Sequence, residues 1–176
     1  QNAFEGEYGF GTIYGRNKAC KEKNFSDGEF LFTDVKHKFH ACCHGTHAAI
    51  EALDYLRHKY NLQREDVSKI LIKVHPRFGT VCNIEDPEFG LEIKFSFKMI
   101  AAMQMFNHDT SQLDTFSDEK CSNQKLIEFR KKVEVNFYHE LKDFEAEVEV
   151  KLLSGQSYAK KYNLNTVVDS KILELR

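Results

Sequence analysis

Residues 38–53 read KFHACCHGTHAAIEAL and lead from a polar loop into a segment with a helical pattern. Thr46 is a residue type that favours the N-cap position, just before a helix begins. Beyond it, four apolar residues recur at the three- and four-residue spacing of one helix face: Ala49, Leu53, Leu56 and Tyr60. The stretch therefore predicts a loop followed by a helix over about 47–60.

Alternation of apolar and polar residues predicts strands elsewhere in the chain. Residues 68–75 have one apolar face, as a half-buried strand does. Residues 133–137 and 146–152 alternate in the same way, and the short linker between them predicts an antiparallel pair. A further short strand is expected at 30–35.

Two more helices are expected between these strands. The first covers about 91–106 and carries Lys94 and Lys98 one turn apart on its polar side. The second begins after an N-cap at Ser117 and ends near residue 131. The element order β-α-β-α-α-β-β predicts an α+β fold, in which helices pack on one face of a small, mostly antiparallel sheet.

The composition is that of a globular protein, with 41% hydrophobic and 30% charged residues. The formal net charge of -2 argues against a dedicated nucleic-acid-binding protein, although a local cluster of cations could still bind an acidic substrate. No run approaches the ~18 apolar residues of a membrane span. The odd number of cysteines, five, and the lack of a signal-like apolar opening predict reduced thiols in a cytoplasmic protein.

Residues 36–47 hold the densest reactive chemistry in the chain, and three interpretations of them are open. They contain four of the eight histidines, two lysines and two cysteines. One interpretation is a zinc site, whose ligands would be His40, Cys43, His44 and His47. Structural zinc sites usually have a second ligand cluster, whereas Cys82 and Cys121 each stand alone in the sequence. The second interpretation is a solvated polar loop without a chemical role.

The third interpretation is an anion-binding catalytic loop. The start of a helix offers free backbone N–H groups and the positive end of the helix dipole. Lys38 and His47 would add side-chain donors there. Clustered positive charge also lowers the pKa of a lysine, so that Lys38 could serve as a general base. Lys94 is similarly ambiguous, because a lysine on a helix face is more often a solvated charge than a ligand.

Two segments resemble motifs of one enzyme family. The stretch 38–53 is similar to a signature in which a lysine is followed by Thr-His-x-Ala-Ile. The run Val81-Cys82-Asn83, followed by Pro87 and then GLEIKFS at 90–96, resembles a second signature in the expected order and at a similar separation. The similarity covers roughly residues 4–155. The chain thus resembles the MmgE/PrpD family, which includes 2-methylcitrate dehydratases, cis-aconitate decarboxylases and an iminodisuccinate epimerase.

The resemblance implies that residues 25–155 form the smaller α/β lid domain of a two-domain enzyme, which is usually a dimer. Residues 1–24 would then be the segment leading out of a large helical domain, and residues 156–176 a C-terminal tail. The active site would lie between the lid and the helical domain. The implied chemistry is that of a lyase or isomerase acting on di- or tricarboxylic acids without a metal or cofactor. Such chemistry needs a base near the reacting carbon and cations near the carboxylates.

The resemblance also places six residues in the site: Lys38, Cys43 and His47 at catalytic positions, and Lys94, Ser96 and His44 at substrate-binding positions. Two positions depart from the pattern. Cys43 stands where some relatives have a histidine and others a cysteine, and Met99 stands where many have a tyrosine. A donor role of that tyrosine would be unfilled here. The cysteine at position 43 removes an acid or base that the resemblance implies for the decarboxylases, which argues against a specific assignment to cis-aconitate decarboxylation.

We therefore expect a lid domain that contributes half of a carboxylate-binding site. Because a site open on one side cannot hold both carboxylates or exclude water, the chain alone should be inactive. Its expected partners are a di- or tricarboxylate, a helical domain or subunit of the same family, and a second copy of itself, but no nucleic acid and no membrane. Two rival hypotheses are a non-catalytic interaction module that keeps only the lid fold, and a small zinc-binding domain.

Overall fold

The computed structural model describes residues 37–165. The strand expected at 30–35 and the N-terminal segment at 1–24 lie outside the described residues. None of the helices among residues 37–165 combines the length and the apolar character that crossing a membrane requires.

The centre of the fold is a four-stranded sheet with the strand order β2-β1-β3-β4. Its strands are β1 (Val67–Val74), β2 (Val133–Phe137), β3 (Glu145–Leu152) and β4 (Ser157–Asn163). β1 pairs with β2 in parallel, whereas the pairs β1–β3 and β3–β4 are antiparallel. The sheet is therefore mixed and mostly antiparallel, which confirms the α+β fold class predicted from the sequence.

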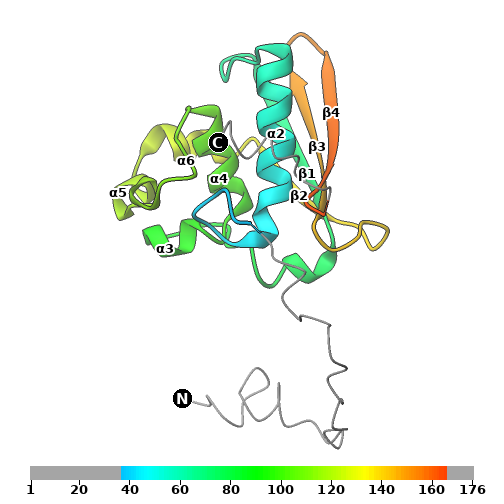
Figure 1. Ribbon diagram of the computed structural model, residues 1–176. Coiled ribbons are helices and arrows are strands. Elements are labelled where there is room, and N and C mark those ends of the chain that lie inside the picture. Colours follow the sequence, from blue (N-terminus) through cyan, green and yellow to red (C-terminus); the bar gives the residue numbers. More distant parts are fainter. Residues whose placement is uncertain (1–36, 166–176) are drawn as a thin grey trace, which may run out of the picture. The chain divides into compact units, whose positions relative to one another are not determined.

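The longest helix, α2 (His47–Tyr60), lies along the sheet, and α4 (Phe97–Met105) lies beside it (Figure 1). α2 contacts β3 and β4, while α4 contacts α2 and β2. Phe97 and Leu53, 2% and 1% exposed, belong to the apolar core that these helices form with the sheet. The apolar spacing that predicted the helix over 47–60 corresponds to this buried side of α2, because a helix is stabilised mainly by packing its apolar face.

The two other predicted helices are each broken in the structure. The segment 91–106 forms α3 (Gly90–Ile93) and α4, separated by a turn in which Ser96 is extended and its hydroxyl accepts a hydrogen bond from the N–H of Met99. Lys94 and Lys98 consequently do not stack on one helix, which corrects the sequence prediction. The apolar pattern continues across the break because Ile93 before it and Phe97 after it are both buried.

The segment after Ser117 is divided in the same way, into α5 (Asp118–Cys121) and α6 (Gln124–Arg130). The side chain of Asn123 accepts hydrogen bonds from the N–H groups of Lys125 and Leu126 and so caps α6. Serine and asparagine compete in this way with helical hydrogen bonding, which periodicity alone does not register. Three short 3-10 turns complete the described part: η1 (His44–Thr46), η2 (Pro76–Phe78) and η3 (Leu113–Thr115).

The predicted antiparallel pair of strands 133–137 and 146–152 is wrong. These segments are β2 and β3, and β1 lies between them. The chain at 138–144 crosses from one side of β1 to the other, because β1 supplies apolar side chains such as Ile70 and Ile72 that favour a central position.

β4 was not predicted from the sequence, because residues 157–163 (SYAKKYN) contain few apolar side chains. An edge strand tolerates such polar and charged residues. Tyr158 nevertheless stacks on Tyr60 of α2, with ring centroids 4.0 Å apart, and this contact joins the edge of the sheet to the helix.

Candidate functional site

Two backbone hydrogen bonds place the loop before α2. The N–H of Ala41 donates to the carbonyl of Thr110 (2.8 Å), and the N–H of Cys43 donates to the carbonyl of Lys94 (3.0 Å). The motif at 38–53 is therefore held directly against the motif that ends at 90–96, although about fifty residues separate the two contact points in the chain. The turn between α3 and α4 exposes the Lys94 carbonyl for this contact, because the short helix ends there.

A cavity of about 460 Å³ lies where the two motifs meet. It is lined by Lys38, His40, Ala41, Cys42, Cys43, Leu91, Lys94, Phe95, Ser111 and Leu113. Three of the six predicted site residues, Lys38, Cys43 and Lys94, are thus brought together. None of these lining residues is acidic, so the formal charges on this wall are all positive.

Within the part of the chain that the structure describes, the two lysines of this cavity are not neutralised by neighbouring carboxylates. Among residues 37–165, neither Lys38 nor Lys94 forms an ion pair with an aspartate or glutamate. The ammonium of Lys94 lies 5.5 Å from the ring centroid of Phe116, a cation–π contact that leaves its charge uncompensated. The wall therefore carries two positive charges that a bound anion could compensate.

Cys43 is the acidic thiol of the cavity. The thiol of Cys82 donates a hydrogen bond to Sγ of Cys43 across 3.2 Å. This bond, together with the backbone of Gly45 and the charge of Lys38, lowers the pKa of Cys43 to about 6 against the effect of partial burial. Cys43 is therefore largely a thiolate at neutral pH and can accept a proton or attack an electrophile.

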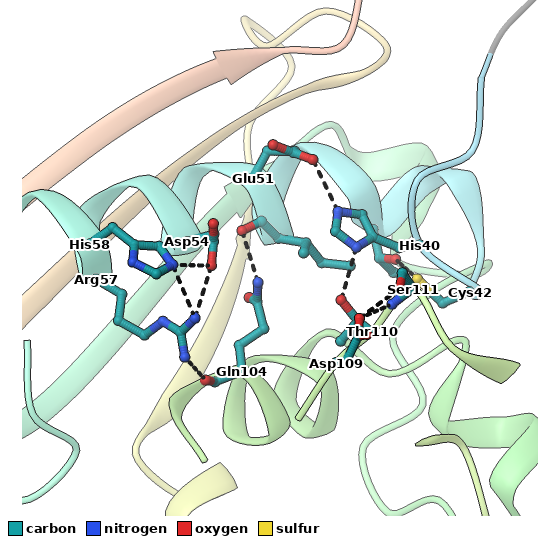
Figure 2. Close-up of polar contacts among 12 residues, drawn as sticks. His40, Cys42, Glu51, Asp54, Arg57, His58, Gln104, Asp109, Thr110 and Ser111 are labelled. Atoms are coloured by element: carbon teal, nitrogen blue, oxygen red, sulfur yellow. Dashed lines mark hydrogen bonds and ion pairs between the residues drawn. The ribbon is translucent and has the colours of Figure 1, made fainter. Parts of the chain in front are cut away.

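His40 and its partners were not assigned a role in the family site by the sequence. Its Nε2 lies 3.0 Å from Oε1 of Glu51 on α2, and its Nδ1 lies 2.8 Å from the hydroxyl of Thr110 (Figure 2). Both ring nitrogens are therefore held in place at the cavity wall. Glu51 is only 6% exposed although it is charged, and the sequence did not indicate this burial, because Asp54 lies one turn away on the same side of the helix.

His47 is placed differently from the expectation that it would contact an anion. Its side chain is 1% exposed and does not line the cavity. Burial, and then the nearby His40, His44 and Lys38, lower the pKa of His47 to about 3. The ring is neutral at physiological pH and adds no positive charge to the site. Its Nε2 is buried without a hydrogen-bond partner among residues 37–165.

The remaining predicted residues, Ser96 and His44, also lie outside the cavity lining. Ser96 is fully buried and serves as the N-cap of α4. His44 lies in η1, where its ring contacts the rings of His47 and Phe144. Thr46 precedes α2 as predicted, but its hydroxyl donates to the carbonyl of Cys43 (2.8 Å) and makes no capping bond to the helix.

The start of α2 differs from the expected anion-binding terminus. The preceding η1 turn uses the N–H of Thr46, which donates to the carbonyl of Cys43, and the N–H of His47, which donates to the carbonyl of His44. Positive charge in the cavity therefore comes from lysine side chains. Among residues 37–165, no group of three or more His, Cys, Asp or Glu side chains is arranged to hold a metal ion, so the geometry does not support the zinc interpretation.

A second cavity, of about 500 Å³, lies on the other side of His40 and differs in its charges. It includes Glu51, Asp54 and Asp109, and its Arg57 is paired with Asp54 (3.1 Å). Figure 2 shows Glu51 and Asp54 on α2, and Asp109 in the segment that follows α4. Because acidic groups line it, this cavity is less suited to a polycarboxylate than the one at Lys38 and Lys94.

Comparison with known families gives one match. The model of the MmgE/PrpD C-terminal domain matches residues 40–162, which is more than half of the chain. The matched range begins at His40, after Lys38, and includes the rest of the loop before α2, both parts of the second motif and the whole sheet except its last residue. A comparison with curated proteins found no match.

Proposed function

This chain belongs to the MmgE/PrpD family through its C-terminal domain, and we propose that it contributes the cationic half of a carboxylate-binding active site. The proposed substrate class is a di- or tricarboxylic acid. The proposed reaction is of the lyase or isomerase type, as in 2-methylcitrate dehydratases, and removes a group or a proton at a carbon next to a carboxylate.

The observation that carries this proposal is the charge of the 460 Å³ cavity. Lys38 and Lys94 face it from two different segments, and none of its lining residues is acidic. Two ammonium groups on separate elements can each bind one carboxylate of the same molecule, which fixes the orientation of a polycarboxylate. Positive charge at this position also stabilises the negative charge that builds up when the adjacent carbon loses a proton.

We assign distinct roles to the residues of the cavity. Lys94 is a carboxylate clamp, and Lys38 is a second clamp or the base. Cys43 is a further candidate for proton transfer, because its thiolate is available at neutral pH. His40 is a positioning residue at the wall, held by Glu51 and Thr110. His47, His44 and Ser96 support the loop and α4 from behind the wall.

We propose that the other half of the active site is supplied by a helical domain or by another subunit. That subunit could be a second copy of the chain. Leu91 and Leu113, 67% and 68% exposed, lie at the cavity and offer apolar surface for such a partner. The same surface favours the alternative function, an interaction module without catalysis. The isolated chain is expected to bind substrate weakly and to show no turnover of 2-methylcitrate or cis-aconitate.

Isothermal titration of citrate into the chain tests the clamp. We expect weak binding by the wild type and a loss of roughly tenfold in affinity, about 1.4 kcal/mol, for Lys38→Ala and for Lys94→Ala. Lys98→Ala is the matched control, because Lys98 pairs with Glu85 (2.8 Å) and does not line the cavity. Equal affinities in all four proteins, or no binding by the wild type, would contradict the proposed clamp and leave the interaction module as the better account.

A further inference from the structure

Cys43 and Cys82 form a close pair of thiols within the described part of the chain. Their sulfur atoms are 3.2 Å apart, although the residues are separated by 39 positions in the sequence. Cys43 is held by its backbone bond to Lys94 (3.0 Å). Cys82 is held on both sides, because its N–H donates to the carbonyl of Phe78 (2.8 Å) and its carbonyl accepts from the N–H of Phe97 (3.2 Å).

A glycine makes this approach possible. A Cβ atom at Gly45 would lie 2.6 Å from the ring of Phe78 and 3.0 Å from Sγ of Cys82. Any larger residue would therefore force the turn that follows Cys43 away from the segment that carries Cys82. The absence of a side chain at this one position lets the two sulfur atoms meet.

We infer that Cys43 and Cys82 are a peroxide-sensitive dithiol pair, in which Cys43 is oxidised first and Cys82 resolves the product. The thiolate sulfur of Cys43 attacks one oxygen of hydrogen peroxide, and the O–O bond breaks. Cys43 becomes a sulfenic acid, and the departing hydroxide takes up the proton that the Cys43 thiol had released to solvent and leaves as water. The sulfur of Cys82 then attacks the Cys43 sulfur, the S–O bond breaks, and a second water leaves. Two thiols are oxidised to one disulfide, and one peroxide is reduced to two water molecules.

The surroundings of the two sulfurs support this order of events. Cys43 is one of the residues that line the cavity and is only partly buried, whereas Cys82 is fully buried. Cys43 is the only one of the four cysteines among residues 37–165 whose pKa is lowered, because the Cys82 thiol, the Gly45 backbone and Lys38 stabilise its thiolate. Burial raises the pKa of Cys42 to about 11, and that of Cys121 is also raised by burial.

The geometry requires only a small movement for the disulfide. The sulfurs must approach by about 1 Å from their present separation to reach bonding distance. Because Cys43 belongs to the wall of the lysine cavity, oxidation removes its thiolate from that wall. The inference does not depend on the proposed function, since the two thiols and the peroxide suffice for the chemistry.

The test is peptide mass spectrometry of the folded chain after treatment with hydrogen peroxide, with dimedone present to trap sulfenic acid. In the wild type we expect a Cys43–Cys82 disulfide and little dimedone adduct. In Cys82→Ser, which keeps a hydroxyl donor but cannot form the disulfide, we expect dimedone to accumulate on Cys43. Cys121→Ser is the matched control and should behave as the wild type, because Cys121 is also partly exposed but has a raised pKa.

A second measurement does not require any variant to fold. The rate of iodoacetamide alkylation at Cys43 of the wild type, followed against pH, should have its midpoint near pH 6. The inference is overturned if peroxide treatment of the wild type links Cys43 to a cysteine other than Cys82, oxidises the five cysteines equally, or leaves Cys43 a thiol. An alkylation midpoint in the ordinary range of a free thiol, about 8.5, would overturn it as well.

Discussion

Replacing His47 with asparagine should make the stability of the domain less dependent on pH. His47 is fully buried, and its pKa in the folded state is lowered to about 3. In the unfolded chain the same imidazole has its ordinary pKa of 6.5 and is therefore protonated at a higher pH. The unfolded chain therefore binds more protons than the folded chain between these two values, and stability must fall as the pH is lowered through this window. His47→Asn keeps a side-chain donor near the position of Nδ1 and removes the titration.

The size of the effect follows from the two pKa values of His47. Integrating the difference in proton uptake from about pH 7.5 down to about pH 5 gives a loss of about 2 kcal/mol in the free energy of unfolding of the wild type. The stability that the neutral, buried His47 contributes is fully present above its unfolded-state pKa of 6.5. Most of it is lost when the pH has fallen to its folded-state pKa of about 3. The asparagine variant lacks this contribution.

Urea unfolding monitored by circular dichroism at the two pH values measures the effect. The free energy of unfolding of the wild type should fall by about 2 kcal/mol more than that of His47→Asn between about pH 7.5 and about pH 5. Parallel pH dependences of the two proteins would refute the reasoning, because they would show that the imidazole is protonated as readily in the folded state as in the unfolded chain.

Three further predictions concern packing and capping. Gly90→Ala should lower the free energy of unfolding by about 1–3 kcal/mol in thermal or urea denaturation, because its Cβ would lie 2.2 Å from the backbone oxygen of Phe116. Ser96→Ala should cost about 1 kcal/mol of stability through the lost N-cap and leave citrate affinity unchanged in titration calorimetry. A double-mutant cycle between Tyr60 and Tyr158 should give a coupling of about 0.5–1.5 kcal/mol in urea unfolding, because their rings stack.

Each of these predictions has a specific contrary result. Gly155→Ala is the control for Gly90→Ala, because nothing lies within 4 Å of its added Cβ and only its positive φ of 87° opposes the change. A larger loss of unfolding free energy in Gly155→Ala than in Gly90→Ala would contradict the packing argument. A selective loss of citrate binding in Ser96→Ala would return Ser96 to the substrate site. A coupling of zero for the tyrosine pair would contradict the placement of β4.

The sequence correctly predicted the helices and strands that have one apolar face along their whole length. The helix over 47–60 and the strand over 68–75 correspond to α2 (His47–Tyr60) and β1 (Val67–Val74), because both bury one side of their length. Helix breaks and strand pairings depend on other interactions. The cap at Ser96 interrupts a continuous apolar pattern, and the position of β1 between β2 and β3 follows from tertiary packing rather than from the length of a linker.

The sequence predicted those residues of the candidate site that belong to a recognisable local motif. Lys38 and Lys94 were identified through two separate motifs, and the structure brings both to one cavity. The sequence could not show that His47 is buried, since a histidine before an apolar helix face is compatible with either a buried or an exposed ring. The contacts of His40 with Glu51 and of Cys43 with Cys82 likewise arise only when distant segments meet.

The central claim, that the cavity at Lys38 and Lys94 binds carboxylates, is tested most directly by mapping the amide chemical-shift changes that citrate causes in the folded chain. We expect the largest changes in the segments 38–43, 91–95 and 111–113, which contain the residues that line that cavity, and their loss in Lys38→Ala. Changes centred on Arg57, Asn107 and the second cavity, or no changes when citrate is added, would contradict the account.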